Sequence, residues 1–105
     1  MNLYILEDYV AMLNRLEILY KAVPKDLKNL VKDNIVIVLS KIADFVAENL
    51  VTNKPIDLSL LSGTSIIITI NLKLEMLIVQ FVFGDSDKTY VEVPLQPYRF
   101  SEGDL

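Results

Sequence analysis

The stretch NIVIVLSKIADFVAENLV, from Asn34 to Val51, is the most apolar part of a longer helical pattern over residues 25–51. Its apolar residues recur at spacings of four and three along one helix face, which contains Leu27, Val31, Ile35, Val38, Ile42 and Phe45. A second apolar line beside it contains Leu39, Ala43, Val46 and Leu50. Because residues 35–39 are then apolar on nearly every side, we expect a buried central helix.

Residues 34–39 also fit a different structure. Every residue from Ile35 to Val38 is β-branched, and such residues are stiff at χ1 and favoured in strands. However, no glycine or proline brackets this run, and the helical spacing continues on both sides of it. We therefore favour the helix and keep a short buried strand as the alternative.

Residues 3–23 carry the pattern of an amphipathic helix. Its apolar residues recur at alternating spacings of three and four, and they are Leu6, Tyr9, Leu13, Leu16, Tyr20 and Val23. The helix should end at Val23, because the residue before Pro24 is pushed out of the α region and proline suits the start of the next helix. So short a connection predicts an antiparallel helical hairpin.

Residues 65–93 carry the pattern of a β-sheet. Apolar and polar residues alternate from Ile66 to Glu75, which predicts a strand with one solvated face. The alternation breaks at Met76, so we expect a turn or bulge within 71–75 and then a strand over 76–83. The loop Gly84–Asp87 predicts a hairpin into a third strand, 89–93, which Pro94 ends.

These elements predict one α+β domain over residues 1–105. We expect a two-helix antiparallel hairpin, 3–52, packed on one face of a three-stranded, mostly antiparallel β-meander, 65–94. A linker, 53–64, joins the two parts, and a C-terminal tail covers 95–105.

The strand 76–83 is the reason to expect an assembly. It is apolar on both faces apart from Gln80, and such a strand must be covered on both faces, whereas the two helices can cover only one. The strand residues that we assign to a candidate protein interface are Leu77, Val79 and Phe81. The other face is left to another molecule or to the tail residues Leu95, Tyr98 and Phe100.

Two further surfaces are candidates for protein contact. Tyr4, Ala11 and Ile18 repeat at seven on the otherwise polar face of the first helix, which fits a narrow contact seam or merely scattered surface apolar residues. In the tail, tyrosine and arginine are frequent interface anchors, although a tail of this composition can also simply lie over the sheet. The tail residues in question are Tyr98, Arg99 and Phe100.

Composition and charge exclude several function classes. The chain has 105 residues, 52% of them apolar, and a net charge of −4, which argues against general binding to nucleic acid or to an anionic membrane. It has no cysteine and no histidine, so Ser-His and Cys-His nucleophile systems are impossible. The absence of cysteine and the density of isoleucine, leucine and valine would suit a thermophilic source.

A lysine cluster is the main polar feature of the helical hairpin. Lys25, Lys28 and Lys32 lie on one side of the second predicted helix, and Lys21 lies near the end of the first. Together they could contact phosphates or an acidic partner, or form an ordinary solvated face moderated by neighbouring acids. The cluster supports an alternative function as an accessory factor of nucleic-acid machinery.

The sequence predicts no metal, cofactor or catalytic site. Asp85 and Asp87 flank Ser86 in a loop, but the further oxygen ligands of a calcium loop are missing and these residues are also standard turn formers. No signal peptide and no membrane span is recognisable, so we expect a cytoplasmic protein. The function that we expect is a non-enzymatic protein–protein interaction module, acting as a homodimer or as an accessory or inhibitory subunit, without a small-molecule substrate.

Overall fold

The computed structural model describes residues 2–52, 61, 64–83 and 87–95, with side chains from Leu6 onward. Its elements, in chain order, are α1 (Asn2–Ala22), the 3-10 turn η1 (Lys25–Leu27), α2 (Lys28–Val51), β1 (Ile66–Asn71), β2 (Met76–Phe83) and β3 (Asp87–Pro94). Two helices pack against a three-stranded antiparallel sheet of order β1-β2-β3, which confirms the predicted α+β fold.

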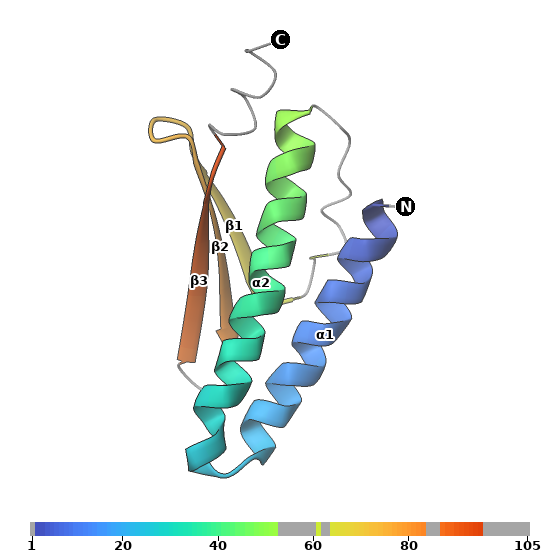
Figure 1. Cartoon of the computed structure of the whole chain (residues 1–105), viewed down its shortest axis with the longest axis vertical. Helices are drawn as coiled ribbons and strands as arrows, with labels where there is room; N and C mark the ends of the chain where they lie inside the picture. Colours follow the sequence, from blue (N-terminus) through green and yellow to red (C-terminus); the bar gives the residue numbers. More distant parts are fainter. Residues whose placement is uncertain (1, 53–60, 62–63, 84–86, 96–105) are drawn as a thin grey trace.

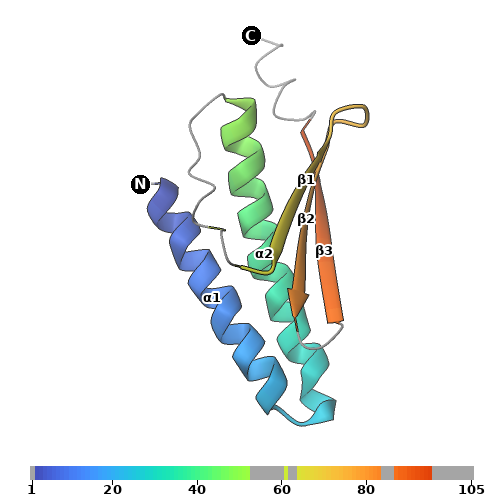
Figure 2. The ribbon, with the colours of Figure 1, turned by 180° about the vertical axis from the view of Figure 1, so that it is seen from behind.

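Helix α2 is the centre of the molecule. It packs against α1 on one side and against β2 and β3 on the other (Figures 1 and 2). Residues 34–39 are helical, so the alternative of a buried strand there is wrong. Ile35 and Leu39 are fully buried, but Ile37 is 54% exposed, so this part of α2 is not covered on every side as expected.

The connection between the helices follows from Pro24. Helix α1 ends at Ala22, and the N–H of Val23 still donates to the carbonyl of Leu19 at 3.0 Å. Pro24 is extended, with φ −61° and ψ 157°, and its carbonyl accepts from the N–H of Leu27 at 2.9 Å to form η1. The predicted antiparallel hairpin is confirmed, because the chain reverses within these few residues.

The two faces of β2 differ in burial. Alternate residues face α2 and are fully buried, and these are Leu77, Val79, Phe81 and Phe83. The residues between them are only half-buried on the outer face, and these are Met76, Ile78, Gln80 and Val82. Within the described residues, both helices lie on the inner side of the sheet (Figures 1 and 2).

The turn between β1 and β2 occupies residues 72–75, inside the predicted range 71–75. The Oδ1 atom of Asn71 accepts a hydrogen bond from the N–H of Leu74 at 3.1 Å, as asparagine commonly does at the start of a turn. Glu75 closes the turn with a left-handed backbone, φ 53°. Asn71 was the local turn signal that the alternation pattern alone did not reveal.

The linker and the tail lie largely outside the described residues. In the linker, Leu61 is half-buried and its carbonyl accepts from the hydroxyl of Thr64 at 2.6 Å. Leu95 continues the inner face of β3 and belongs to the core, near Leu50 and Ile70. The expectation that Leu95 covers the outer sheet face is therefore wrong, while Tyr98 and Phe100 lie outside the described residues.

Candidate functional site

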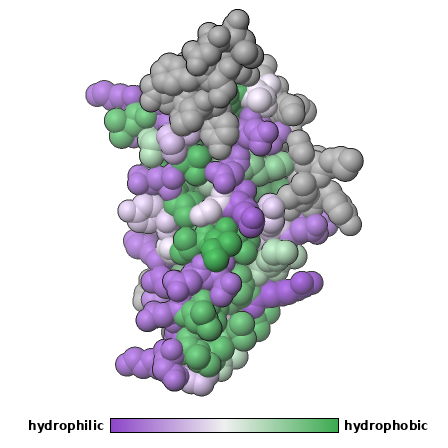
Figure 3. Space-filling view, viewed as in Figure 1, coloured by the Kyte–Doolittle hydropathy of each residue, from purple (hydrophilic) through white to green (hydrophobic). Residues whose placement is uncertain are grey.

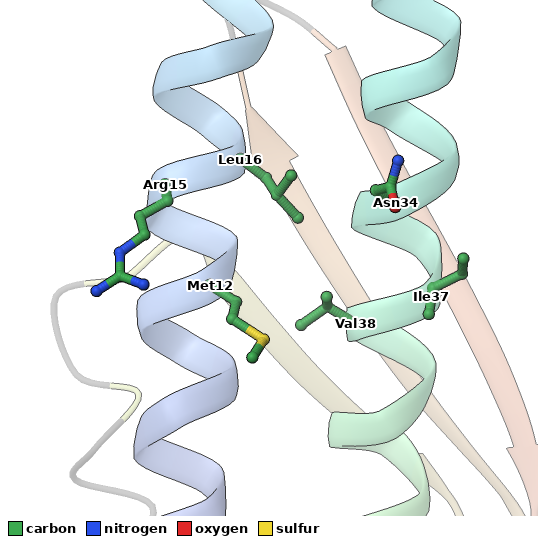
Figure 4. A pocket seen from close by; sticks show the side chains of 6 residues that line it. All are labelled: Met12, Arg15, Leu16, Asn34, Ile37 and Val38. Carbon is green, nitrogen blue, oxygen red and sulfur yellow. The ribbon is translucent and has the colours of Figure 1, made fainter.

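An apolar groove lies between α1 and α2, on the side of the helices turned away from the sheet. It encloses about 300 Å³ and is lined by Met12, Arg15, Leu16, Asn34, Ile37 and Val38. Figure 4 shows Met12 and Leu16 of α1 and Val38 of α2 pointing into the space between the helices, whereas Ile37 and Arg15 extend outward from its two rims. Figure 3 shows apolar residues gathered over the two helices on this side of the molecule.

Two exposed leucines extend the helix faces of Met12 and Ile37 toward the turn between the helices. Leu19 follows Met12 by seven residues on α1, and Leu30 precedes Ile37 by seven on α2, so each pair lies along one side of its helix. These four side chains are between 44% and 62% exposed. We call Met12, Leu16, Leu19, Leu30, Ile37 and Val38 the helical groove.

Sequence reasoning missed the helical groove. Met12 and Leu19 lie beside the core-facing line of α1 in the sequence pattern, and Ile37 was expected to be buried. The seven-residue spacing in both helices was the available signal, because two apolar rows outside the core stripes indicate a second apolar surface. The pattern could not show that the two rows meet, since that depends on how the helices pack.

The predicted seam on α1 lies outside the helical groove. Ile18 is 70% exposed and Ala11 is half-buried, and neither lines the groove. The side chain of Tyr4 lies outside the described residues. The seam therefore stays a prediction, and Ile18 is its most exposed residue among those described.

The strand residues assigned to an interface are in the core instead. Leu77, Val79 and Phe81 are at most 1% exposed beneath α2, so a partner cannot reach them in this fold. The strand is apolar on both faces, and the pattern could not tell which face the helices cover. The tail candidates Tyr98, Arg99 and Phe100 lie outside the described residues.

The outer sheet face combines apolar and polar residues. In register, Ile67 of β1 lies beside Gln80 of β2, which lies beside Tyr90 of β3. Ile67 and Tyr90 are more than half exposed, while Gln80 is half-buried. This face is more polar than the helical groove, because Thr69, Lys88 and Glu92 also belong to it.

Two of the four clustered lysines have partners within the protein. Lys21 pairs with Glu17, one turn earlier on α1, at 3.7 Å. Lys28 donates to the carbonyl of Tyr20, near the C-terminal end of α1, and lies 4.6 Å from the centre of the Tyr20 ring. Both contacts fit a structural role at a helix end, while contact of Lys25 and Lys32 with phosphates or acids stays a prediction.

Tyr20 is the centre of a cluster that joins the helices to the sheet. Its ring packs edge-on against Phe83, with ring centres 4.8 Å apart, and its hydroxyl donates to the carboxylate of Asp87. This hydrogen bond to Asp87 raises the pKa of Tyr20 above its ordinary value of 10.0, with further contributions from burial and from the charge of Asp87. Asp87 thus links β3 to α1 as the hydrogen-bond acceptor of Tyr20. Asp85 and Ser86 lie outside the described residues.

The described residues contain no group of three or more acidic, histidine or cysteine side chains arranged to hold a metal ion. Within the same residues, neither helix has the length and apolar character needed to cross a membrane. The chain matches no protein-family model, and no curated protein or solved structure is significantly similar to it. The helical groove is therefore the candidate functional site on geometric grounds alone.

Proposed function

We propose that this chain is a small, non-enzymatic protein-binding module whose helical groove receives an amphipathic helix of another protein. One observation carries the proposal: Met12 and Ile37 line an apolar groove from its two helices and are 44% and 54% exposed, and the exposed Leu19 and Leu30 extend the same helix faces. An apolar patch of this kind on a small protein typically marks a contact surface.

The spacing of the groove residues favours a helical partner. Met12 and Leu19 span two turns of α1, and Leu30 and Ile37 span two turns of α2. A third helix lying along two antiparallel helices presents apolar residues at intervals of three, four and seven, which match such rows. Helix-in-groove binding is therefore the recognition mode that fits the apolar rows of α1 and α2.

Charge at the rim favours an acidic flank on the partner. Arg15 is the charged residue that lines the groove, and it is exposed and directed outward. The amide of Asn34 is already engaged, since its Nδ2 atom donates to the carbonyl of Leu30 at 2.9 Å. A glutamate beside the apolar stripe of the partner would thus meet Arg15 without competing for Asn34.

Two synthetic amphipathic peptides of about 15 residues test this proposal. Both carry leucines at intervals of three and four, and they differ only in glutamate or lysine beside the leucine stripe. We expect the glutamate peptide to bind more tightly in a fluorescence anisotropy titration. Ile37→Asp should abolish this binding, because it introduces a charge into the apolar wall of the groove.

The matched control is Ile18→Asp, which places the same charge on an exposed isoleucine of α1 outside the groove. It should leave the affinity for the glutamate peptide unchanged. Circular dichroism of both variants checks that they remain folded. Equal loss of binding in the two variants, or no binding of either peptide to the unaltered chain, would contradict the proposed function.

A further inference from the structure

Strand β3 is an edge of the sheet, with β2 on one side and, among the described residues, no strand on the other. Figures 1 and 2 both show this side of β3 at the margin of the ribbon. An exposed edge presents unpaired backbone N–H and C=O groups that can pair with another strand. Its behaviour therefore depends on which of its residues point outward.

The hydrogen-bond pattern identifies the outward-pointing groups. The N–H of Leu95 donates to the carbonyl of Glu75 at 2.8 Å, and the register between β2 and β3 is continuous from Met76 and Pro94 onward. Hydrogen-bonded pairs alternate along an antiparallel ladder, so the odd-numbered residues of β3 bond to β2. The backbone groups of Lys88, Tyr90 and Glu92 therefore point away from β2, toward the open edge.

These three residues are complementary to themselves. If a second β3 pairs antiparallel about Tyr90, then Tyr90 lies opposite its own copy and Lys88 lies opposite Glu92 of the other copy, twice by symmetry. All of these are hydrogen-bonded positions, because the same residues carry the outward backbone groups. Each lysine thus meets a glutamate directly across the join.

The other edge of the sheet lacks this property. The N–H of Val82 in β2 donates to the carbonyl of Ser65, just before β1, so in β1 Ile66, Ile68 and Ile70 carry the outward backbone groups. Pairing of β1 with a second copy about Ile68 would bring no opposite charges together. On β3, Pro94 is the next outward-pointing residue after Glu92, and because it has no N–H it ends the row of outward backbone donors.

We infer that two copies of this chain associate through β3, about a two-fold axis at Tyr90, to form a continuous six-stranded sheet. The inference goes beyond the proposed function, because it names a second partner, another copy of the chain, and the sheet edge that receives it. Because α2 packs on β3 as well as β2, the join also brings the two α2 helices beside each other and keeps the inner face covered. The helical groove is a separate surface.

Charge reversal tests the pairing by sedimentation velocity over a range of concentrations. Lys88→Glu and Glu92→Lys each place like charges opposite one another twice, so each variant alone should dimerise roughly tenfold or more weakly. An equimolar mixture of the two should regain the affinity of the unaltered chain, because every glutamate then faces a lysine. A monomeric unaltered chain, or a mixture no tighter than its components, would overturn the inference.

Engineered cysteines test the register, since the natural chain has none. Hydrogen-bonded residues across an antiparallel join have Cα atoms about 5.5 Å apart, within the range of a disulfide. Tyr90→Cys should therefore form a covalent dimer under mild oxidation. Lys88→Cys should do so only when mixed with Glu92→Cys. Covalent dimers of Lys88→Cys alone at the rate of Tyr90→Cys would contradict the register.

Failure of this inference is distinguishable from failure of the proposed function. The groove variant Ile37→Asp should keep the dimer mass, and Lys88→Glu should keep the affinity for the glutamate peptide. A monomer that still binds the peptide overturns the β3 join and leaves the groove proposal intact. A dimer that binds no peptide supports the join and contradicts the groove.

Discussion

Tyr20 shows how one side chain joins three elements of this fold. Its ring contacts Phe83 of β2 and Lys28 of α2, while its hydroxyl reaches Asp87 of β3. Helical spacing in the sequence identified Tyr20 as a core residue of α1 but could not reveal its polar partner. Asp87, 67 residues later, was weighed as a calcium ligand and interpreted as a turn former.

The raised pKa of Tyr20 predicts a stability loss in alkali. Its proton is held more tightly in the folded state than in the unfolded state, where the pKa is near 10.0. The stabilisation is therefore complete below pH 10 and declines as the pH rises above it toward the folded-state pKa. In urea unfolding, Tyr20→Phe should be less stable than the unaltered chain at pH 9. Between pH 9 and pH 11 it should lose less stability than the unaltered chain, because phenylalanine has no proton to release. A Tyr20→Phe variant that loses as much stability between pH 9 and pH 11 as the unaltered chain would contradict this prediction.

Glu75 supports a second prediction at the residue scale. Its φ of 53° lies in the left-handed region, which asparagine tolerates and β-branched residues do not. Glu75→Val should cost about 1 kcal/mol more than Glu75→Asn in free energy of unfolding. Both substitutions remove the glutamate side chain. The difference between their free energies of unfolding in urea therefore measures the cost of the left-handed backbone conformation. Equal stability of the two variants would mean that residue 75 is not left-handed.

At the element scale, α2 shows what its apolar pattern could predict. The two lines of spacing three and four correctly placed most buried residues of this helix, including Ile35, Leu39 and Ile42. Ile37 lies off both lines and is exposed, because α1 and the sheet meet α2 on only part of its circumference. The pattern describes one helix, whereas the angle between its two neighbours is a property of the whole fold.

The two isoleucines of α2 form a matched pair for mutation. Ile42 is fully buried and Ile37 is 54% exposed, and both are central in the same helix. Ile42→Ala should lower the free energy of unfolding by about 3 kcal/mol through the cavity that it leaves. Ile37→Ala should lower it by about 1 kcal/mol or less, since it removes little packing. Similar losses of unfolding free energy in the two variants would show that α2 presents a different face to α1 and the sheet.

The strand β2 shows the complementary limit of sequence reasoning. Its boundaries and its antiparallel neighbours were predictable from alternation and turn residues. The face of β2 that the helices cover was not predictable from the sequence. Leu77 and Ile78 point to opposite faces and are both apolar, so either face could pack against a helix. The core assignment of Leu77, Val79 and Phe81 follows only from the packing of α2.

At the scale of the whole molecule, the candidate surfaces lie on different sides of one scaffold. The helical groove opens on the side of the helices turned away from the sheet, and β3 forms one edge of the sheet. The sequence indicated more apolar surface than two helices and three strands can cover, and contact with other molecules stays a prediction drawn from it. It could not locate that surface, since Met12 and Ile37 become neighbours only when the helices pair.

The measurement that tests the central claim most directly is an amide NMR titration of the chain with the glutamate peptide. The largest shift changes should map to Met12, Leu16, Leu19, Leu30, Ile37 and Val38, with little change along β1 and β3. That result would identify the groove between α1 and α2 as the binding surface. Shift changes concentrated on the sheet, or their absence at saturating peptide, would contradict the account.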